Sequence, residues 1–218
     1  MRSSRWPHYA LILAGYALGA VALRAGLPEG IPPSVTFRDG SIVWLGGPMI
    51  AFLLPTAVAV MEVLVHRLSG ARAVDEPGSI SAAEVNDAIM LRVTVFVLGV
   101  HAMVLVAVQG VLHGRAWAAQ IVPVMLGCTL LSVGNLLPRT RPNLAIGIRT
   151  RRTLADRAVW ATAHRLVGYI VVACGVVTVV AALAVPRPVG PLMIFLLSPV
   201  ALVVTWFAVR ASSKHGDA

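Results

Sequence analysis

The stretch LVGYIVVACGVVTVVAALAV, residues 166–185, decides the fold class of this chain. It contains no charged residue, and a helix of this length spans about 30 Å, the thickness of the hydrocarbon core of a bilayer. The whole chain of 218 residues is 58% hydrophobic and only 12% charged, with a mean hydropathy of +0.83. This composition excludes a soluble globular protein and predicts an integral membrane protein.

Six apolar stretches are long enough to cross a bilayer: residues 9–27, 47–65, 90–112, 116–137, 158–185 and 189–209. The sequence therefore predicts an all-α polytopic membrane protein with six transmembrane helices. Similar segments that begin at Gly47 and Gly190, with Pro123 in the fourth stretch, fit three helical hairpins, although proline and glycine are frequent in membrane helices anyway. The first stretch also fits a cleavable signal peptide, but Gly15 and Gly19 form a GxxxG face suited to helix packing.

The basic residues divide unevenly between the two sides of this six-span arrangement. With both termini in the cytoplasm, only four of the 18 Lys and Arg residues lie outside: Arg24, Arg38, Arg115 and Arg187. The positive-inside rule favours this orientation. Anionic lipid headgroups are the expected counter-charge for a net charge of +9. We expect a multi-pass membrane protein with both termini cytoplasmic.

The most informative segment is GNLLPRTRPNLAIGIRTRRTLADRAVWATAHRLVGY, which runs from Gly134 to Tyr169. Its two prolines stop the fourth helix, and Asn143 and Gly147 suit turns, so this inner loop is predicted to have a defined structure. Thr153 is expected to cap a fifth helix that begins before the membrane, with Asp156 completing the cap. Trp160 is expected to anchor this helix at the membrane interface.

Five Arg side chains within residues 139–152 leave two interpretations of the loop open. The loop is either a built binding site or a positive collar that meets lipid headgroups and responds to charge alone. For the built site we predict these ligand-binding or partner-binding residues: Asn135, Arg141, Asn143, Arg149, Thr150, His164 and Arg165.

Ionisable residues inside the predicted spans are further candidates, because each costs several kcal/mol unless it is paired or solvated. Glu62 and Arg92 have similar depths near the inner ends of successive spans, which favours an ion pair. His66 lies four residues after Glu62 and shares its helix face. His101 lies about 13 Å deeper than Arg92 by helical rise. It is the best candidate for proton coupling, against the alternative of a hydrogen bond to a neighbouring helix.

The sequence contains no recognisable catalytic or metal motif. HExxH and GxSxG are absent, and His101 and His113 would stand about 18 Å apart on one helix. Cys128 and Cys174 lie inside apolar runs without the spacing of metal ligands. We therefore predict no enzymatic activity, no cofactor, no metal site and no direct binding of nucleic acid. The remaining enzyme alternative would place three of the loop candidates around a lipid headgroup: His164, Arg165 and Asn135.

The same block resembles the SdpI family of bacterial membrane proteins. The resemblance rests on Gly134-Asn135, PR.RPN (138–143), GIRT (147–150), Thr153-Leu154, Trp160, and His164-Arg165 followed by Gly168. The segment LPEGIPPSV, residues 27–35, weakly resembles the DUF1648 domain that commonly precedes it. We accordingly divide the chain into three parts: a DUF1648-like N-terminal hairpin (1–66), an inner loop with the third helix (67–115), and an SdpI-like domain with the basic cytoplasmic loop (116–218).

The resemblance implies a protein of the bacterial plasma membrane that acts by binding. Such a protein confers immunity to a secreted antimicrobial peptide toxin outside the cell, or signals by capturing a cytoplasmic transcriptional repressor, while it contacts membrane lipids. The alternative is a small proton-coupled transporter or exporter that uses His101 and Glu62. A flux assay separates the two, because a transporter must move a solute whereas an immunity or sequestration protein need only bind.

Cysteine labelling tests the predicted topology. In intact cells, a membrane-impermeant thiol reagent should react with Gly40→Cys and should not react with Arg149→Cys or Ser212→Cys. Permeabilised cells, in which all three sites are accessible, provide the control. Labelling of Arg149→Cys in intact cells would contradict the six-span arrangement.

Overall fold

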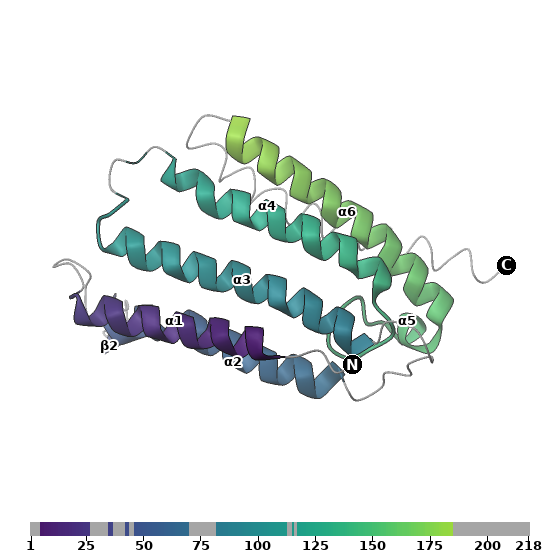
Figure 1. The fold of residues 1–218 in the computed structure, drawn as a ribbon. Coiled ribbons are helices and arrows are strands. Elements are labelled where there is room, and N and C mark those ends of the chain that lie inside the picture. The colour runs from purple at the N-terminus through teal and green to yellow at the C-terminus, as the bar shows by residue number, and fades with distance from the viewer. Residues whose placement is uncertain are drawn as a thin grey trace. The chain divides into compact units, whose positions relative to one another are not determined.

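The computed structural model describes residues 5–26, 35–36, 42–43, 46–69, 82–112, 115 and 117–184. Five long helices make up most of the described chain (Figure 1): α1 (Trp6–Arg24), α2 (Gly47–Ser69), α3 (Ala82–Val108), α4 (Ala118–Leu136) and α6 (Arg157–Ala184). Two shorter elements join α4 to α6, the 3-10 helix η1 (Leu137–Arg139) and the helix α5 (Arg151–Ala155). Two short antiparallel strands, β1 (Val35–Thr36) and β2 (Ile42–Val43), lie between α1 and α2 in the sequence.

The five long helices are each long and apolar enough to cross a membrane. Only 17% to 33% of each spanning stretch is buried inside the protein. Large apolar side chains such as Leu13, Val60 and Val180 are exposed, as expected for helices that face lipid. The prediction of an all-α, multi-pass membrane protein is confirmed. The predicted sixth span, residues 189–209, lies outside the described residues, as does the DUF1648-like segment except for Val35.

The helix ends differ most from the predicted limits in two places. α3 begins at Ala82, well before the predicted start at residue 90. The predicted fifth helix is broken, because α5 ends at Ala155 and α6 begins at Arg157. Asp156, between them, has an extended backbone with φ −127° and ψ 121°.

The chain divides into two compact units. We call residues 4–62 and 94–118 the hairpin unit, and residues 1–3, 63–93 and 119–218 the loop unit. This division shows only which residues pack together, and it does not test the sequence domains predicted above. Those domains, residues 1–66, 67–115 and 116–218, stay a prediction.

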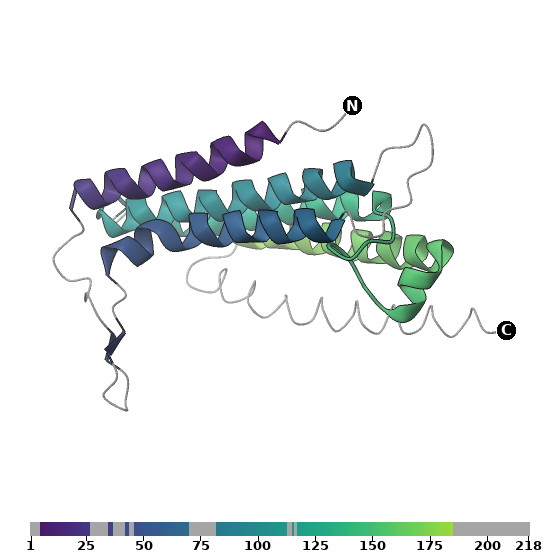
Figure 2. The same cartoon turned by 90° about the horizontal axis from the view of Figure 1, so that it is seen from below.

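In the hairpin unit, α1 comes closest to α2 near the C-terminal end of α1 and the N-terminal end of α2 (Figure 2). A Cβ atom added to Gly19 would lie 2.2 Å from the carbonyl oxygen of Ala51, so no larger residue fits. One added to Gly15 would lie 3.2 Å from Cγ of Pro55, which is inside α2. The predicted GxxxG face is therefore confirmed as a helix-packing surface.

In the loop unit, α4 and α6 run side by side and meet at two pairs of glycines (Figure 1). A Cβ atom on Gly134 would lie 2.9 Å from the carbonyl oxygen of Gly168, and one on Gly168 would lie 2.7 Å from that of Gly134. Gly127 and Gly175 oppose each other in the same way, at 2.9 Å in both directions. Small residues let two membrane helices approach until their backbones touch.

Adding one methyl group at this contact should destabilise the loop unit. In Gly168→Ala the new Cβ would meet the Gly134 backbone and the ring of Pro138, which cannot move away freely. We expect the free energy of unfolding in detergent to fall by about 1–3 kcal/mol, the usual cost of overpacking. Ala173→Val, which adds bulk to an exposed position of the same helix, is the control. Equal melting temperatures for the two variants would contradict the packing argument.

Candidate functional site

The inner loop between α4 and α6 folds into a compact structure that begins with a turn around Asn143. This side chain is completely buried, and its Oδ1 accepts hydrogen bonds from the backbone N–H groups of Ala145 and Ile146, both at 2.8 Å. Its Nδ2 donates to the carbonyl of Arg141 at 2.7 Å. All these bonds are local, so Asn143 shapes the turn as the sequence predicted.

His164 on α6 holds the next part of the loop. Its Nε2 accepts a hydrogen bond from the backbone N–H of Ile148 at 3.0 Å. Because a backbone N–H can only donate, the ring proton must be on Nδ1, which donates to the carbonyl of Trp160 at 2.9 Å. Gly147 has a φ of +116°, and a Cβ there would lie 2.2 Å from Nε2 of His164. The ring is completely buried, and both of its nitrogens are used in holding backbone.

Trp160, one turn before His164, connects α6 to the start of the loop. Its ring stacks on that of His164, with centroids 3.9 Å apart and planes 16° from parallel. Its Nε1 donates to the carbonyl oxygen of Thr140 at 3.0 Å. Oγ1 of Thr140 in turn donates to the carbonyl of Leu137 at 2.7 Å. Trp160 is only 1% exposed, so the prediction of an interfacial anchor is wrong.

The end of the loop is closed by two helix caps. Oγ1 of Thr150 accepts from the N–H of Thr153 at 3.1 Å, and Oγ1 of Thr153 accepts from the N–H of Thr150 at 2.9 Å. The prediction of Thr153 as the cap of one long helix is therefore wrong, because Thr150 caps the short α5. Oδ1 of Asp156 accepts from the N–H of Ala158 at 2.7 Å, which starts α6 as a separate helix.

Exposed arginine side chains surround this folded loop: Arg139, Arg149, Arg151, Arg152, Arg157 and Arg165. Nη1 of Arg149 also donates to the carbonyl of Leu144, which fixes one edge of its guanidinium group. Arg141 differs from them, since its Nη1 is buried and makes no hydrogen bond within the described part of the chain. The loop therefore presents positive charge on a backbone held by hydrogen bonds.

The residues predicted to bind a ligand or partner have different surroundings. Asn143 and His164 are buried inside the loop, whereas Asn135 and Arg165 are exposed on α4 and α6. The enzyme alternative needs His164 beside Asn135 and Arg165 as a reactive group, but its nitrogens are occupied. Their role in binding stays a prediction.

Thr140 was missed as a structural residue, and so were the capping role of Thr150 and the buried position of Trp160. The four-residue spacing of Trp160 and His164, which places both side chains on one face of a helix, was a usable signal. The Thr-x-x-Thr spacing of Thr150 and Thr153 was a usable signal for a cap.

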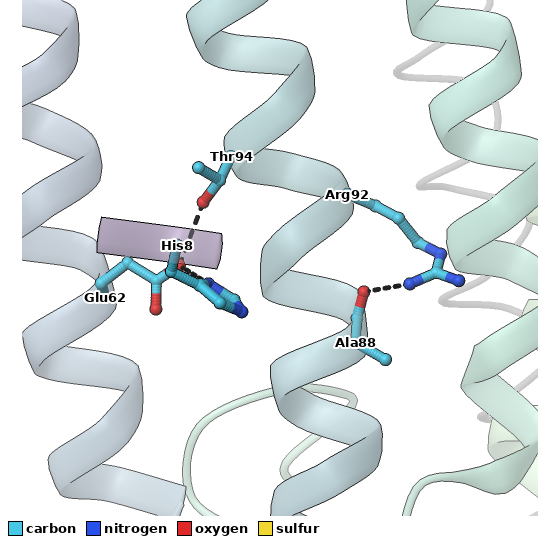
Figure 3. A network of polar contacts seen from close by, with 5 residues as sticks. All are labelled: His8, Glu62, Ala88, Arg92 and Thr94. Carbon is cyan, nitrogen blue, oxygen red and sulfur yellow. Dashed lines mark hydrogen bonds and ion pairs between the residues drawn. The ribbon is translucent and has the colours of Figure 1, made fainter. Parts of the chain in front are cut away.

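Glu62 and Arg92 fall in different compact units, so their predicted ion pair stays a prediction, and each side chain has partners inside its own unit (Figure 3). Oε1 of Glu62 contacts Nδ1 of His8 and accepts a hydrogen bond from Oγ1 of Thr94 at 3.0 Å. Arg92 donates from Nε to Oγ of Ser132, on α4, and from Nη1 to the carbonyl of Ala88.

Two further intramembrane predictions have different outcomes. His66 is exposed, and within the described residues the histidine that contacts Glu62 is His8. His101 is completely buried in the hairpin unit, as its predicted depth suggested. Its ring meets the backbone of Gly15 on α1, although neither ring nitrogen forms a hydrogen bond of normal geometry within the described residues. The predicted bond to a neighbouring helix therefore stays a prediction.

Removing the His164 ring should loosen the loop without removing the helices. In His164→Ala the N–H of Ile148 loses its acceptor, at a cost of about 1–3 kcal/mol for a buried group. We expect trypsin to cut faster after Arg149, Arg151 and Arg152 in this variant. Arg165→Gln, which changes the exposed neighbour, is the control. Unchanged cleavage of His164→Ala would show that the loop does not depend on this ring.

Comparison with known proteins gives one finding. Residues 139–209 match the SdpI/YfhL protein family, and this match begins within η1 and includes the folded loop and α6. No curated protein and no solved structure matched the chain. The resemblance predicted from the sequence is confirmed, because residues 139–209, which include the folded loop and α6, match the model of the SdpI/YfhL protein family.

Proposed function

We propose that this chain is an SdpI-like membrane protein that works by binding, without covalent chemistry. It confers immunity to a secreted antimicrobial peptide toxin or signals by capturing a cytoplasmic transcriptional repressor. The folded loop is its inner binding surface. The observation that carries this proposal is the hydrogen-bonded loop with arginines on its outside.

A loop that only attracts lipid headgroups through its positive charge does not need a backbone held by buried hydrogen bonds. Anionic headgroups attract any cluster of Lys and Arg near the membrane surface, by about 1 kcal/mol for each charge. Here buried side chains hold the loop, including His164 on Ile148 and Trp160 on Thr140. A fixed backbone keeps guanidinium groups at fixed spacings, which suits paired hydrogen bonds to carboxylates or phosphates on a partner.

The surroundings of His164 also support binding over catalysis. A general acid or base needs a nitrogen that is free to exchange a proton with a substrate. Both nitrogens of His164 are bonded to backbone groups, and the ring is completely buried. The arginines exposed around it can bind anionic groups but are poor proton donors at neutral pH.

Charge-preserving substitutions test the proposal in a deletion strain that carries the gene on a plasmid. The strain is challenged with peptides secreted by neighbouring bacteria, and growth is measured. The triple variant Arg149→Lys, Arg151→Lys, Arg165→Lys keeps the charge and loses the planar guanidinium groups. We expect it to reach normal abundance and to lose protection by about tenfold or more in the inhibitory dose, since hydrogen bonds to charged groups contribute about 1.5–3 kcal/mol.

Arg24→Lys and Arg115→Lys are matched controls, because both change exposed arginines far from the loop in the sequence. They should leave protection unchanged. Full protection by the triple Lys variant, with a graded loss on substitution by Gln, would contradict the binding surface and identify a lipid collar.

A proton-coupled transporter or exporter is the second candidate function. It is favoured by the buried His101, whose ring nitrogens form no regular hydrogen bond in the described part of the chain. Solute flux in proteoliposomes, driven by a pH gradient, distinguishes it from the binding proposal.

A further inference from the structure

The hairpin unit contains a seam where α1, α2 and the second half of α3 meet. The buried residues of α3 on this seam are Thr94, Leu98, His101 and Leu105. Their spacing of four, three and four residues is that of a coiled-coil seam. The buried residues of α1 have the same alternation from His8 onward. Polar residues at these positions therefore face other helices and not lipid.

The side chains of the seam form successive layers along the helices, which we call levels. The first level is polar, and its residues His8, Glu62 and Thr94 connect all three helices (Figure 3). Nδ1 of His8 on α1 contacts Oε1 of Glu62 on α2, and their side chains are only 7% and 13% exposed. Oγ1 of Thr94 on α3 donates to the same oxygen at 3.0 Å and is completely buried. One carboxylate oxygen thus has a partner on each of the two neighbouring helices.

The next level is apolar. Ile12, Val58 and Leu98 form a buried cluster, with one residue from each helix. Each of these residues lies four positions from a member of the polar level, which is about one turn along its helix. The apolar level therefore separates the Glu62 level from the next buried residues of α3, His101 and Leu105.

His101 lies beyond this apolar level. It is three residues after Leu98 and seven after Thr94, about 10 Å from Thr94 by helical rise. Its ring is completely buried against the backbone of Gly15, yet neither nitrogen forms a hydrogen bond of normal geometry within the described residues. His101 is therefore a buried titratable ring beyond the apolar level of the seam.

We propose that this seam is a proton-binding site inside the membrane. His8 and Glu62 share one exchangeable proton, Thr94 holds the carboxylate, and His101 is a second proton acceptor beyond the apolar level. The His8–Glu62 pair has no net charge when it holds the proton and a charge of −1 without it. When the proton moves to His101, that ring gains the charge of +1 that the pair has lost.

The transfer makes and breaks only O–H and N–H bonds, so it requires no oxidant or other reactant. It does require water to enter between Ile12, Val58 and Leu98, because these apolar side chains separate the Glu62 level from His101. Among the described residues, His8, Glu62 and His101 are titratable groups of this seam, and Tyr16 packs against its apolar level with its hydroxyl bonded to Thr56. His66 is exposed.

Nuclear magnetic resonance of isotope-labelled histidine nitrogens, in the full-length protein in nanodiscs, measures the proton directly. The nitrogen signals distinguish a neutral ring from an imidazolium, and single substitutions assign the 6 histidines. We expect His101 to convert reversibly between the two forms while the protein stays folded. In Glu62→Gln we expect the protonated fraction of His8 at neutral pH to fall about tenfold, the effect of losing one nearby charge.

Two further variants separate proton binding from structure. Glu62→Gln keeps an acceptor oxygen for Thr94, so its melting temperature should stay near that of the parent protein. His101→Phe removes two nitrogens that form no regular bond, so it should be as stable as the parent or more stable. His66→Gln, at an exposed site on the same helix as Glu62, should leave the signals of His8 and His101 unchanged.

The proposal is overturned if His101 stays neutral down to the pH at which the protein unfolds. It is also overturned if Glu62→Gln leaves the protonation of His8 unchanged, or if His101→Phe is strongly destabilised. These outcomes do not depend on the partner of the inner loop. Failure here therefore leaves the proposed binding surface standing, and failure of the toxin assay leaves the proton site standing.

Discussion

The hydrogen bond from the backbone N–H of Ile148 to Nε2 of His164 is the interaction on which the inner loop depends. Ile148 lies outside any helix or strand, so neither its N–H nor its carbonyl has a partner from regular structure. Oγ1 of Thr153 satisfies the carbonyl at 2.7 Å, and His164 satisfies the N–H. Buried backbone groups must be paired in this way. The requirement explains why a loop that could have been a flexible linker has one conformation.

The helices are held together by a different physical constraint. Apolar side chains gain nothing by leaving lipid for one another, so packing and hydrogen bonds must hold membrane helices together. α4 and α6 satisfy this constraint with two pairs of facing glycines, seven residues apart on each helix. α1, α2 and α3 satisfy it with Gly15 and Gly19 and with one polar level around Glu62. Close backbone contact thus occurs in both units, and the seam of the hairpin unit adds the contact between His8 and Glu62.

The sequence predicted the features that depend on length and local chemistry. Apolar runs identified the five described spans, and the turn residues Asn143 and Gly147 identified a structured loop, because each effect acts within a few residues. Partners between helices were not predictable in the same way. Helical rise gave Glu62 and Arg92 the same depth, but depth does not fix direction. Arg92 and Thr94 are two residues apart, about 200° around α3, and Thr94 bonds to Glu62 whereas Arg92 bonds to Ser132.

Three histidines in this chain show how far the residue type alone determines a role. His164 has a backbone partner for each nitrogen, so a second ring proton would break its bond to Ile148. Nδ1 of His8 contacts the carboxylate of Glu62. His101 has no regular partner, although it is as deeply buried as His164. Burial therefore does not separate a structural histidine from one able to take a proton. What distinguishes these histidines is the hydrogen-bond partner of each ring nitrogen. At His164 one of these partners is the backbone N–H of Ile148, 16 residues away, which a sequence pattern does not reveal.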